Sequence, residues 1–371
     1  MLSFAQIQLL RWRCLSVSKI LMKGNEAIAR AAVAAGCDAF FGYPITPQNE
    51  IPEYLSKLMK EHGRIFVQAE SEVAAINMVY GAAGSGARVM TSSSSCGIAL
   101  KQEGISYIAG SELPCVIVSV MRAGPGLGGI QPSQADYFQA TRGGGNGDYY
   151  VVVLAPESIQ ETVDLMKQAF EIADLYRNPV MVLADGLIGQ MMEAVDLDKP
   201  VKKRHIEPKT YAAIGTDYHE GRNIINSLGL DPVYLEQHNL ALERKYKEII
   251  KHEVQYEMYN MDHAEYIIVA YGTVARISRS AIDELKEQNI HVGMIRPITL
   301  WPYPKKAFDL IPKSVKGLLV VEMSLGQMLD DVQIANKGRF KIAFYGRAGG
   351  MVPEPEEIVD AILHFDEKVV D

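Results

Sequence analysis

The stretch Gly42-Tyr-Pro-Ile-Thr-Pro47 follows directly on a short apolar run at residues 38–42. That run is typical of a buried strand, and the helical pattern before it, at residues 25–36, opens with an Asn that can cap and closes with a Gly. Two prolines fix the backbone around Thr46, so its hydroxyl is held in place. Taken alone, the stretch equally fits a helix entrance with Thr46 as N-cap and Pro47 at the first helical position.

Strand and helix patterns alternate from this stretch as far as residue 192. Strands are predicted at residues 38–42, 64–68, 88–91, 115–121, 150–154 and 179–184. Helices are predicted at residues 25–36, 72–80, 95–108 and 158–173. This order predicts an α/β domain with a doubly wound, largely parallel sheet that has helices on both faces.

A second α/β pattern follows after a break. Between residues 193 and 262 the alternation fails, and a polar, charge-rich segment contains a helical run at 240–256. We therefore predict two domains, 22–192 and 263–371, with 193–262 as the connector. The second domain is expected to have strands at 266–271, 291–296, 317–322 and 341–345, and helices at 274–288, 325–335 and 354–364.

Residues 1–21 differ from the rest of the chain. They contain Arg11, Arg13 and Lys19 but no acidic residue, and polar residues interrupt their apolar part, so they do not form a clean signal peptide. The globular pattern begins at Met22. We expect residues 1–21 to be an upstream extension ahead of a true start at Met22, with a transit peptide as the second interpretation. No apolar run reaches the ~20 residues that a membrane span needs.

Composition narrows the function classes. The 371 residues are 48% hydrophobic and 22% charged, with a formal net charge of -8, which disfavours a nucleic-acid groove. The four cysteines, at positions 14, 37, 96 and 115, form no close spacing, so the sequence predicts neither an iron-sulfur cluster nor a metal site on this chain. Scattered cysteines suit a reducing cytoplasm.

Three glycine-rich stretches could suggest a bound nucleotide. Gly81-Ala-Ala-Gly-Ser-Gly86 follows a helical pattern, whereas a dinucleotide fingerprint follows a strand, so we expect a helix end. Gly124-Pro-Gly-Leu-Gly-Gly129 follows a strand, where open α/β sheets place ligands, but its spacing fits neither a P-loop nor a Rossmann turn. Gly143-Gly-Gly-Asn-Gly147 fits an active-site loop and a long turn equally well.

Two charged residues lie at strand ends near the first stretch. Glu72 opens an apolar helix after the strand at 64–68, and a carboxylate there also complements the helix dipole. Arg122 ends the apolar strand at 115–121, where it can bind a carboxylate or reach solvent. Because the carboxyl ends of parallel strands share one sheet edge, we expect Thr46, Glu72 and Arg122 to lie together.

With these residues in view, the chain from about Met22 to its end resembles the alpha subunit of 2-oxoacid:ferredoxin oxidoreductases. The resemblance depends on several motifs spread over both predicted domains. They are Gly42-Tyr-Pro-Ile-Thr-Pro47, Glu70-Ser-Glu-Val-Ala-Ala75 with Gly81, Gln102-Glu-Gly-Ile-Ser-Tyr107, Glu112-Leu-Pro114, Arg122-Ala-Gly-Pro125, Ala270-Tyr-Gly272, Arg296-Pro-Ile-Thr-Leu-Trp-Pro302 and Glu322-Met-Ser-Leu-Gly-Gln327.

The resemblance implies a fold and a cofactor. The first domain would bind the pyrimidine half of thiamine diphosphate, and the second would be like the C-terminal domain of transketolases. Glu72 matches the family's cofactor glutamate, whose bond to the pyrimidine nitrogen favours the imino tautomer that removes the thiazolium C2 proton. Tyr43, Pro44 and Ile45 would also bind the cofactor. Thr46 and Arg122 would hold the carboxylate of the 2-oxo acid.

The same resemblance implies partner subunits. The motif that binds diphosphate and Mg²⁺ in thiamine enzymes is absent, because Gly147-Asp148 is followed by Tyr149. A beta subunit would supply that half of the site, and iron-sulfur clusters would lie only on partner subunits. A gamma subunit and a ferredoxin-like delta subunit are also expected, with ferredoxin and coenzyme A as substrates.

The substrate is predicted from one region within the family pattern. Residues 116–147 look closest to the enzymes that act on 3-methyl-2-oxobutanoate (2-ketoisovalerate), with the 2-oxoglutarate enzymes as the alternative. An NAD-dependent Rossmann oxidoreductase is a different class, and it would need a glycine fingerprint that the sequence lacks. A non-catalytic scaffold is a further possibility, if no partner completes the site.

Overall fold

The computed structural model describes residues 19–215 and 221–370. Residues 1–18, which include Cys14 and most of the expected upstream extension, lie outside the described residues. The described chain begins with strand β1 (Ile20–Lys23), which pairs antiparallel with β8 (Met192–Val195). Within the described residues, regular structure therefore begins at Ile20, two residues before Met22.

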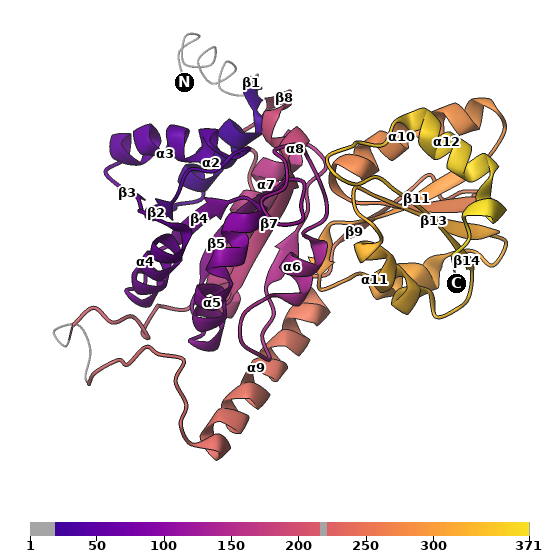
Figure 1. Ribbon diagram of the computed structural model, residues 1–371. Helices are drawn as coiled ribbons and strands as arrows, with labels where there is room; N and C mark the ends of the chain where they lie inside the picture. The colour runs from indigo at the N-terminus through magenta and orange to yellow at the C-terminus, as the bar shows by residue number, and fades with distance from the viewer. Residues whose placement is uncertain (1–18, 216–220, 371) are drawn as a thin grey trace, which may run out of the picture.

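The first domain is built around a sheet that has seven strands in the described chain (Figure 1). Six of these strands are parallel, and the edge strand β12 pairs antiparallel with β6. The predicted doubly wound parallel sheet is confirmed. The strand order is β12 (Thr299–Trp301), β6 (Val152–Leu154), β7 (Pro179–Asp185), β5 (Cys115–Met121), β4 (Val89–Ser93), β2 (Ala39–Gly42) and β3 (Ile65–Gln68).

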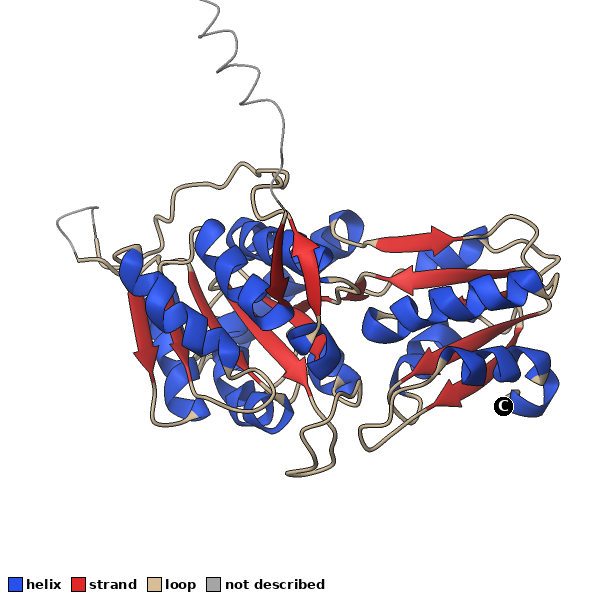
Figure 2. Cartoon of the chain, turned by 90° about the horizontal axis from the view of Figure 1, so that it is seen from above, coloured by secondary structure: helices blue, strands red, loops and turns tan. Residues whose placement is uncertain are grey.

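Helices cover both faces of this sheet (Figure 2). Strand β5 is buried along its whole length, and its alternate side chains enter different cores. Val116 and Val118 pack in one core, whereas Ile117 and Met121 pack in the other. The first core includes helices α2 (Gly24–Ala34), α3 (Glu50–Glu61) and α7 (Ile159–Tyr176), and the second includes α4 (Glu72–Gly84) and α5 (Ser95–Gly110).

The second domain contains a sheet that has five strands in the described chain. The predicted strands and helices of this domain are present, with bounds shifted by a few residues. The sheet order is β14 (Lys341–Gly346), β13 (Gly317–Glu322), β10 (Tyr266–Val269), β11 (Val292–Pro297) and β9 (Tyr256–Tyr259). The helices are α10 (Gly272–Glu287), α11 (Gln327–Asn336) and α12 (Pro355–Leu363), with 3-10 turns η2 (Lys305–Leu310) and η3 (Phe365–Lys368).

The segment 193–262, which we expected to be a connector, contains regular structure at both ends. Helix α9 (Pro232–His252) starts eight residues before the predicted helical run, because Asp231 caps it by accepting a hydrogen bond from Val233 N at 3.0 Å. The helix packs on the first domain through Leu242, Tyr246 and Ile249. Strand β9 then pairs antiparallel with β11, so the second sheet already begins within this segment.

Strand β12 crosses the predicted domain boundary. It lies within residues 263–371, yet it extends the sheet of the first domain by pairing with β6. Trp301 stacks on Tyr150 of the first domain with ring centroids 4.6 Å apart. One hydrophobic core also continues from the first domain into the second, where it includes Ile267, Val320 and Met328. The two domains therefore share both a sheet and a core.

Candidate active site

Thr46 and Arg122 meet at the carboxyl edge of the first sheet. Arg122 follows β5, and its Nη1 donates a hydrogen bond to the main-chain oxygen of Thr46 at 2.9 Å. The Thr46 hydroxyl accepts a hydrogen bond from Asn49 Nδ2 at 3.1 Å, so its own proton is free to bind a ligand. The interpretation of Thr46 as a helix entrance is wrong, because the helix begins at Glu50 with Asn49 at the N-cap position.

The guanidinium of Arg122 is buried among neutral partners. Besides Thr46, its Nη2 donates to the main-chain oxygen of Leu127 at 3.0 Å and to Cys96 Sγ at 3.1 Å. Its Nε has no hydrogen-bond partner among the described residues, and only 7% of the residue is exposed. No carboxylate of the described chain forms an ion pair with it. A buried, rigidly held cation of this kind attracts an anionic ligand.

Ser95 and Asp136 support Arg122 and were not predicted. The main-chain N–H of Arg122 donates to Ser95 Oγ at 2.9 Å, and the Ser95 hydroxyl donates to Asp136 Oδ2. Burial raises the pKa of Asp136, while the Ser95 hydrogen bond and the charge of Arg122 oppose this shift. The sequence does place Ser95 at a strand-to-helix junction. It is the last of the consecutive serines at 92–95, however, and nothing in the sequence distinguishes it from the others.

Glu72 is the first residue of α4, as predicted, and only 6% of it is exposed. Ser71 caps the helix by accepting a hydrogen bond from Ala74 N at 3.1 Å. The Glu72 carboxylate accepts no hydrogen bond from the described residues and lies against Gly97. A Cβ atom at Gly97 would lie 2.7 Å from Glu72 Oε1 and would overlap the Ser93 hydroxyl. Glycine therefore leaves the space that the carboxylate occupies.

Tyr43, Pro44 and Ile45 form the outer part of the same loop. Tyr43 and Pro44 are exposed, and Ile45 is half-buried. The turn is held by Gln48, whose main-chain N–H donates to Ile45 O at 3.0 Å and whose side chain donates to Tyr43 O at 3.2 Å. The loop therefore presents its first residues outward while Thr46 faces Arg122.

A cavity of about 550 Å³ at the junction of the two domains is lined by Ser95 and Cys96, which contact Arg122, but Arg122, Thr46 and Glu72 are not among its lining residues. Asp136 is the only charged side chain among the described residues that line it. Its apolar surface includes Met323 and Leu325 from the second domain. It is bounded by Ser95, Cys96, Ala99, Gly124, Pro125, Gly126, Ser133, Ala135, Asp136, Gln139, Met323, Ser324, Leu325, Gln327, Ala348 and Gly349.

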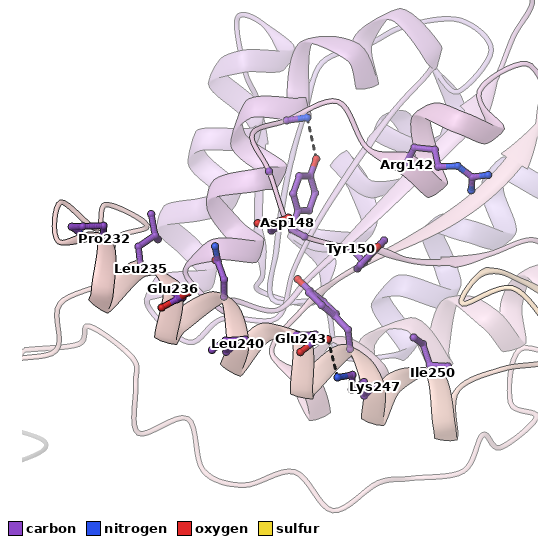
Figure 3. A pocket seen from close by; sticks show the side chains of 15 residues that line it. Arg142, Asp148, Tyr150, Pro232, Leu235, Glu236, Leu240, Glu243, Lys247 and Ile250 are labelled. Atoms are coloured by element: carbon purple, nitrogen blue, oxygen red, sulfur yellow. Dashed lines mark hydrogen bonds and ion pairs between the residues drawn. The ribbon is translucent and has the colours of Figure 1, made fainter.

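The other glycine-rich stretches have separate positions. Residues 81–86 form the end of α4 and its turn, as predicted. Residues 143–147 precede β6 and therefore lie at the opposite edge of the sheet from Arg122. There, Gly144 N donates to Gln102 Oε1 at 3.1 Å, and the loop faces α9 across a cavity of about 890 Å³ (Figure 3). The stretch 143–147 is thus not part of the candidate site.

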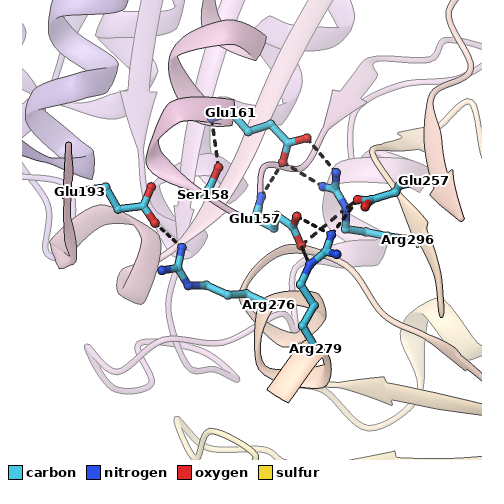
Figure 4. Close-up of polar contacts among 8 residues, drawn as sticks. All are labelled: Glu157, Ser158, Glu161, Glu193, Glu257, Arg276, Arg279 and Arg296. Atoms are coloured by element: carbon cyan, nitrogen blue, oxygen red, sulfur yellow. Dashed lines mark hydrogen bonds and ion pairs between the residues drawn. The ribbon is translucent and has the colours of Figure 1, made fainter. Parts of the chain in front are cut away.

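Polar contacts fix the second domain against the first (Figure 4). Arg296 forms a bidentate pair with Glu161 at 2.8 and 2.9 Å and also contacts Glu257 at 2.9 Å. Nearer the cavity, Gln134 donates to Tyr271 O at 2.9 Å and accepts from Met323 N at 3.0 Å. The contacts of Gln134 attach Met323, at one end of the cavity, to the loop that follows Arg122.

Metal-ligating residues do not cluster in the described chain. No group of three or more His, Cys, Asp or Glu side chains could hold a metal ion there. Cys37 and Cys115 are buried free thiols, and burial raises the pKa of each to about 12. None of the described helices has the length and apolar character required to cross a membrane.

Two family models match the chain. One, described as pyruvate flavodoxin/ferredoxin oxidoreductase, thiamine diphosphate-binding, matches residues 30–275. The other, described as pyruvate:ferredoxin oxidoreductase core domain II, matches residues 264–358. Together the two models span both α/β domains, and the first describes a thiamine diphosphate-binding part of an oxidoreductase. The chain belongs to the pyruvate flavodoxin/ferredoxin oxidoreductase family.

Curated relatives cover nearly the whole chain. It is 48% identical to the ketoisovalerate oxidoreductase subunit VorB of Methanothermobacter thermautotrophicus, over 92% of this chain and 96% of the relative. It is 37% identical to the 2-oxoglutarate synthase subunit KorA of Methanocaldococcus jannaschii, over 92% of this chain and 98% of the relative. The resemblance inferred from the motifs is confirmed.

Solved structures agree with the fold. The 2-oxoglutarate:ferredoxin oxidoreductase from Magnetococcus marinus matches with a TM-score of 0.82 and 26% identity, over 94% of this chain and 65% of that chain. A split gene transketolase matches with a TM-score of 0.57 and 12% identity, over 92% of this chain and 96% of that chain. The second match concerns the fold alone, and it agrees with the expected transketolase-like architecture.

Proposed function

We propose that the chain is the thiamine-pyrimidine-binding subunit of a 2-oxoacid:ferredoxin oxidoreductase that acts on 3-methyl-2-oxobutanoate. The reaction converts the 2-oxo acid, coenzyme A and two oxidised ferredoxins into acyl-CoA, CO₂, a proton and two reduced ferredoxins. The main support is the 48% identity to a ketoisovalerate oxidoreductase subunit, against 37% to a 2-oxoglutarate synthase subunit. The meeting of Thr46 and Arg122 at one sheet edge is consistent with it.

The residues around Glu72 fit the pyrimidine half of thiamine diphosphate. Its buried carboxylate accepts no hydrogen bond from the described residues, and Gly97 leaves room beside it. When bound, the cofactor supplies the thiazolium carbon that adds to the 2-oxo group. Glu72 would exchange a proton with the pyrimidine nitrogen, and a positioned carboxyl group is well suited to this role. Tyr43, Pro44 and Ile45 would form the outer wall of the cofactor site.

Arg122 and Thr46 would hold the carboxylate of the 2-oxo acid. The Arg122 guanidinium is fixed by three neutral acceptors, and no carboxylate of the described chain forms an ion pair with it. The Thr46 hydroxyl can donate a second hydrogen bond. Holding the carboxylate in one orientation favours its loss as CO₂, because the reacting groups are then aligned before the step.

Partner subunits would complete the enzyme in the cytoplasm. A beta subunit would bind the diphosphate and Mg²⁺, and the iron-sulfur clusters would lie on the beta subunit or on a ferredoxin-like delta subunit, with a gamma subunit also present. We expect the purified chain alone to be colourless and inactive. A brown, iron-containing preparation of this chain alone would contradict this division of the site.

Substrate preference tests the proposal directly. The complex with all partner subunits should be assayed with a panel of 2-oxo acids, with ferredoxin as acceptor. We expect kcat/KM to be higher for 3-methyl-2-oxobutanoate than for 2-oxoglutarate, because the cavity lined by Ser95 and Cys96, the contacts of Arg122, has apolar surface and lacks a cationic side chain in the described residues. A preference of roughly tenfold or more for 2-oxoglutarate would make the chain a subunit of that enzyme instead.

The same assay distinguishes this enzyme from a scaffold protein and from an NAD-dependent oxidoreductase. Failure of the complete complex to turn over any 2-oxo acid would favour the non-catalytic scaffold. Reduction of a nicotinamide cofactor in place of ferredoxin would favour the NAD-dependent class, although the stretch at 81–86 ends helix α4 rather than opening one after a strand.

A further inference from the structure

Lys101 is a buried lysine next to Glu72. It lies on α5 with 0% of its surface exposed. Its Nζ donates to Thr91 Oγ1 at 3.1 Å and to the main-chain oxygen of Glu72 at 3.4 Å. Burial lowers the pKa of Lys101 to about 8, and the negative charge of Glu72 opposes this shift. An ammonium group without solvent is costly unless an opposite charge lies nearby.

The position of Lys101 on its helix explains this arrangement. Gly97, against which the Glu72 carboxylate lies, is four residues before Lys101 on α5, so both are on one face of the helix. Strand β4 contributes Thr91 to the same pocket. Among the titratable groups of the described chain, Glu72 on α4 is the one whose charge acts on Lys101. The ammonium therefore contacts the first turn of α4 from the α5 side.

We infer that Lys101 is a positioning residue for Glu72, and this inference depends on the proposed function. Its hydrogen bond to Glu72 O fixes the first turn of α4. The negative charge of Glu72 opposes the lowering of the Lys101 pKa, so the two side chains are close enough for their charges to interact. Thiamine chemistry in this subunit would thus depend on a buried lysine that contacts the main chain of Glu72 and does not touch the cofactor.

The variant Lys101→Met distinguishes a positioning role of Lys101 from a role in packing alone. Met has nearly the length of Lys and no charge, so Lys101→Met would preserve the packing and release the desolvation cost of the ammonium. If Lys101 only fills space, the variant should be at least as stable as the wild type and fully active. If Lys101 acts through Glu72, the variant should lose the hydrogen bond to Glu72 O and the nearby positive charge, and both stability and turnover should change.

The first measurement is a double-mutant cycle on the melting of the full chain, with Lys101→Met, Glu72→Gln and the double variant. We expect the double variant to be more stable than the sum of the single effects predicts, because it removes both charges. Additive effects would overturn the inference. If Lys101→Met alone does not fold, the double variant should still fold, and its failure to do so would equally overturn the inference.

The second measurement uses the complete complex with thiamine diphosphate. Lys101→Met should lower kcat by about 10- to 100-fold and alter its pH profile, with less than about a threefold change in KM for the 2-oxo acid. Lys245→Met is the matched control, since Lys245 is also largely buried but pairs with Glu112 rather than with Glu72. An unchanged kcat and pH profile in Lys101→Met would contradict the inference.

The two measurements also distinguish this inference from the proposed function. Absence of thiamine-dependent turnover in the wild-type complex would refute the proposed function, while the melting cycle would still measure the Lys101–Glu72 coupling. Normal wild-type turnover together with an uncoupled pair would refute only the role of Lys101.

Discussion

Arg122 donates a hydrogen bond from Nη1 to the main-chain oxygen of Thr46 at 2.9 Å, across 76 residues of sequence. This contact ties the loop after β2 to the end of β5. In the proposed function, this contact brings the cation of Arg122 and the hydroxyl-bearing Thr46 together for one carboxylate. Substitutions at this edge of the sheet should therefore have the largest effects on turnover.

Arg122→Lys should weaken binding of the 2-oxo acid. A lysine ammonium lacks the planar fork that reaches Thr46, Leu127 and a ligand together. We expect KM to rise about 10- to 100-fold, which corresponds to the ~1.5–3 kcal/mol of a hydrogen bond to a charged group. Steady-state kinetics of the complete complex measures this. Arg142→Lys, on a side chain that pairs with Asp331, is the control. An unchanged KM for the 2-oxo acid in Arg122→Lys would show that Arg122 does not bind the substrate.

Ser95→Ala should destabilise the chain, whereas Ser94→Ala should not. The Ser95 hydroxyl accepts from Arg122 N, and its loss leaves a buried N–H unsatisfied at a cost of about 1–3 kcal/mol. The Ser94 hydroxyl is also buried but has no hydrogen-bond partner among the described residues. Denaturant melting of the two variants compares them directly. Equal stabilities would mean that Ser95 does not support Arg122.

Glu72→Gln should preserve the fold and lose the chemistry. The amide keeps the size of the side chain, but it cannot exchange a proton with the pyrimidine nitrogen, and loss of such a group lowers rates by about 10²- to 10⁴-fold. Turnover and C2-proton exchange at saturating thiamine diphosphate are the measurements. Glu70→Gln, on an exposed side chain two residues earlier, is the control. If C2-proton exchange in Glu72→Gln stays near the wild-type rate, Glu72 has no catalytic role and only stabilises the start of α4.

The stability of the chain should depend on Lys101 between about pH 8 and pH 10.5. The pKa of Lys101 is lowered from 10.5 to about 8 in the folded chain, so in this range the unfolded chain binds more protons than the folded one. The free energy of unfolding should therefore rise with pH through this window. Urea titrations at about pH 7.5, 9 and 10.5 should show that the wild type gains stability relative to Lys101→Met. If the difference in unfolding free energy between the wild type and Lys101→Met is the same at all three pH values, the lowered pKa of Lys101 is contradicted.

Much of the fold could be predicted because the first sheet is buried on both faces. Its strands are continuous apolar runs, as in β5, and these are easily distinguished from the helical patterns between them. Strand β12 was missed because it has three residues, and its pairing with β6 depends on the docking of two domains rather than on local sequence. Strand β9 was missed because its side chains are only half-buried.

The residues of the candidate site also divide into those that the sequence could predict and those that it could not. The positions of Thr46, Glu72 and Arg122 could be predicted because each follows a recognisable strand, and parallel strands end at one edge. Asp136 could not, because it lies in a loop whose path back to Ser95 is set by tertiary contacts. Lys101 could not, because a lysine in a helical pattern is normally solvated, and its burial follows from the packing of α5 between α4 and β4.

The extension of the first sheet by β12 makes the two halves of the chain one cooperative unit. A fragment ending at residue 262 would expose β6 as an unpaired edge strand, and it would remove Trp301 from the ring of Tyr150. Such a fragment should aggregate rather than behave as an autonomous domain, and the intact chain should melt in a single transition. Insertions of foreign sequence are therefore better placed at the exposed residues 226–228, ahead of α9, than after α9, where the sequence suggests a domain boundary.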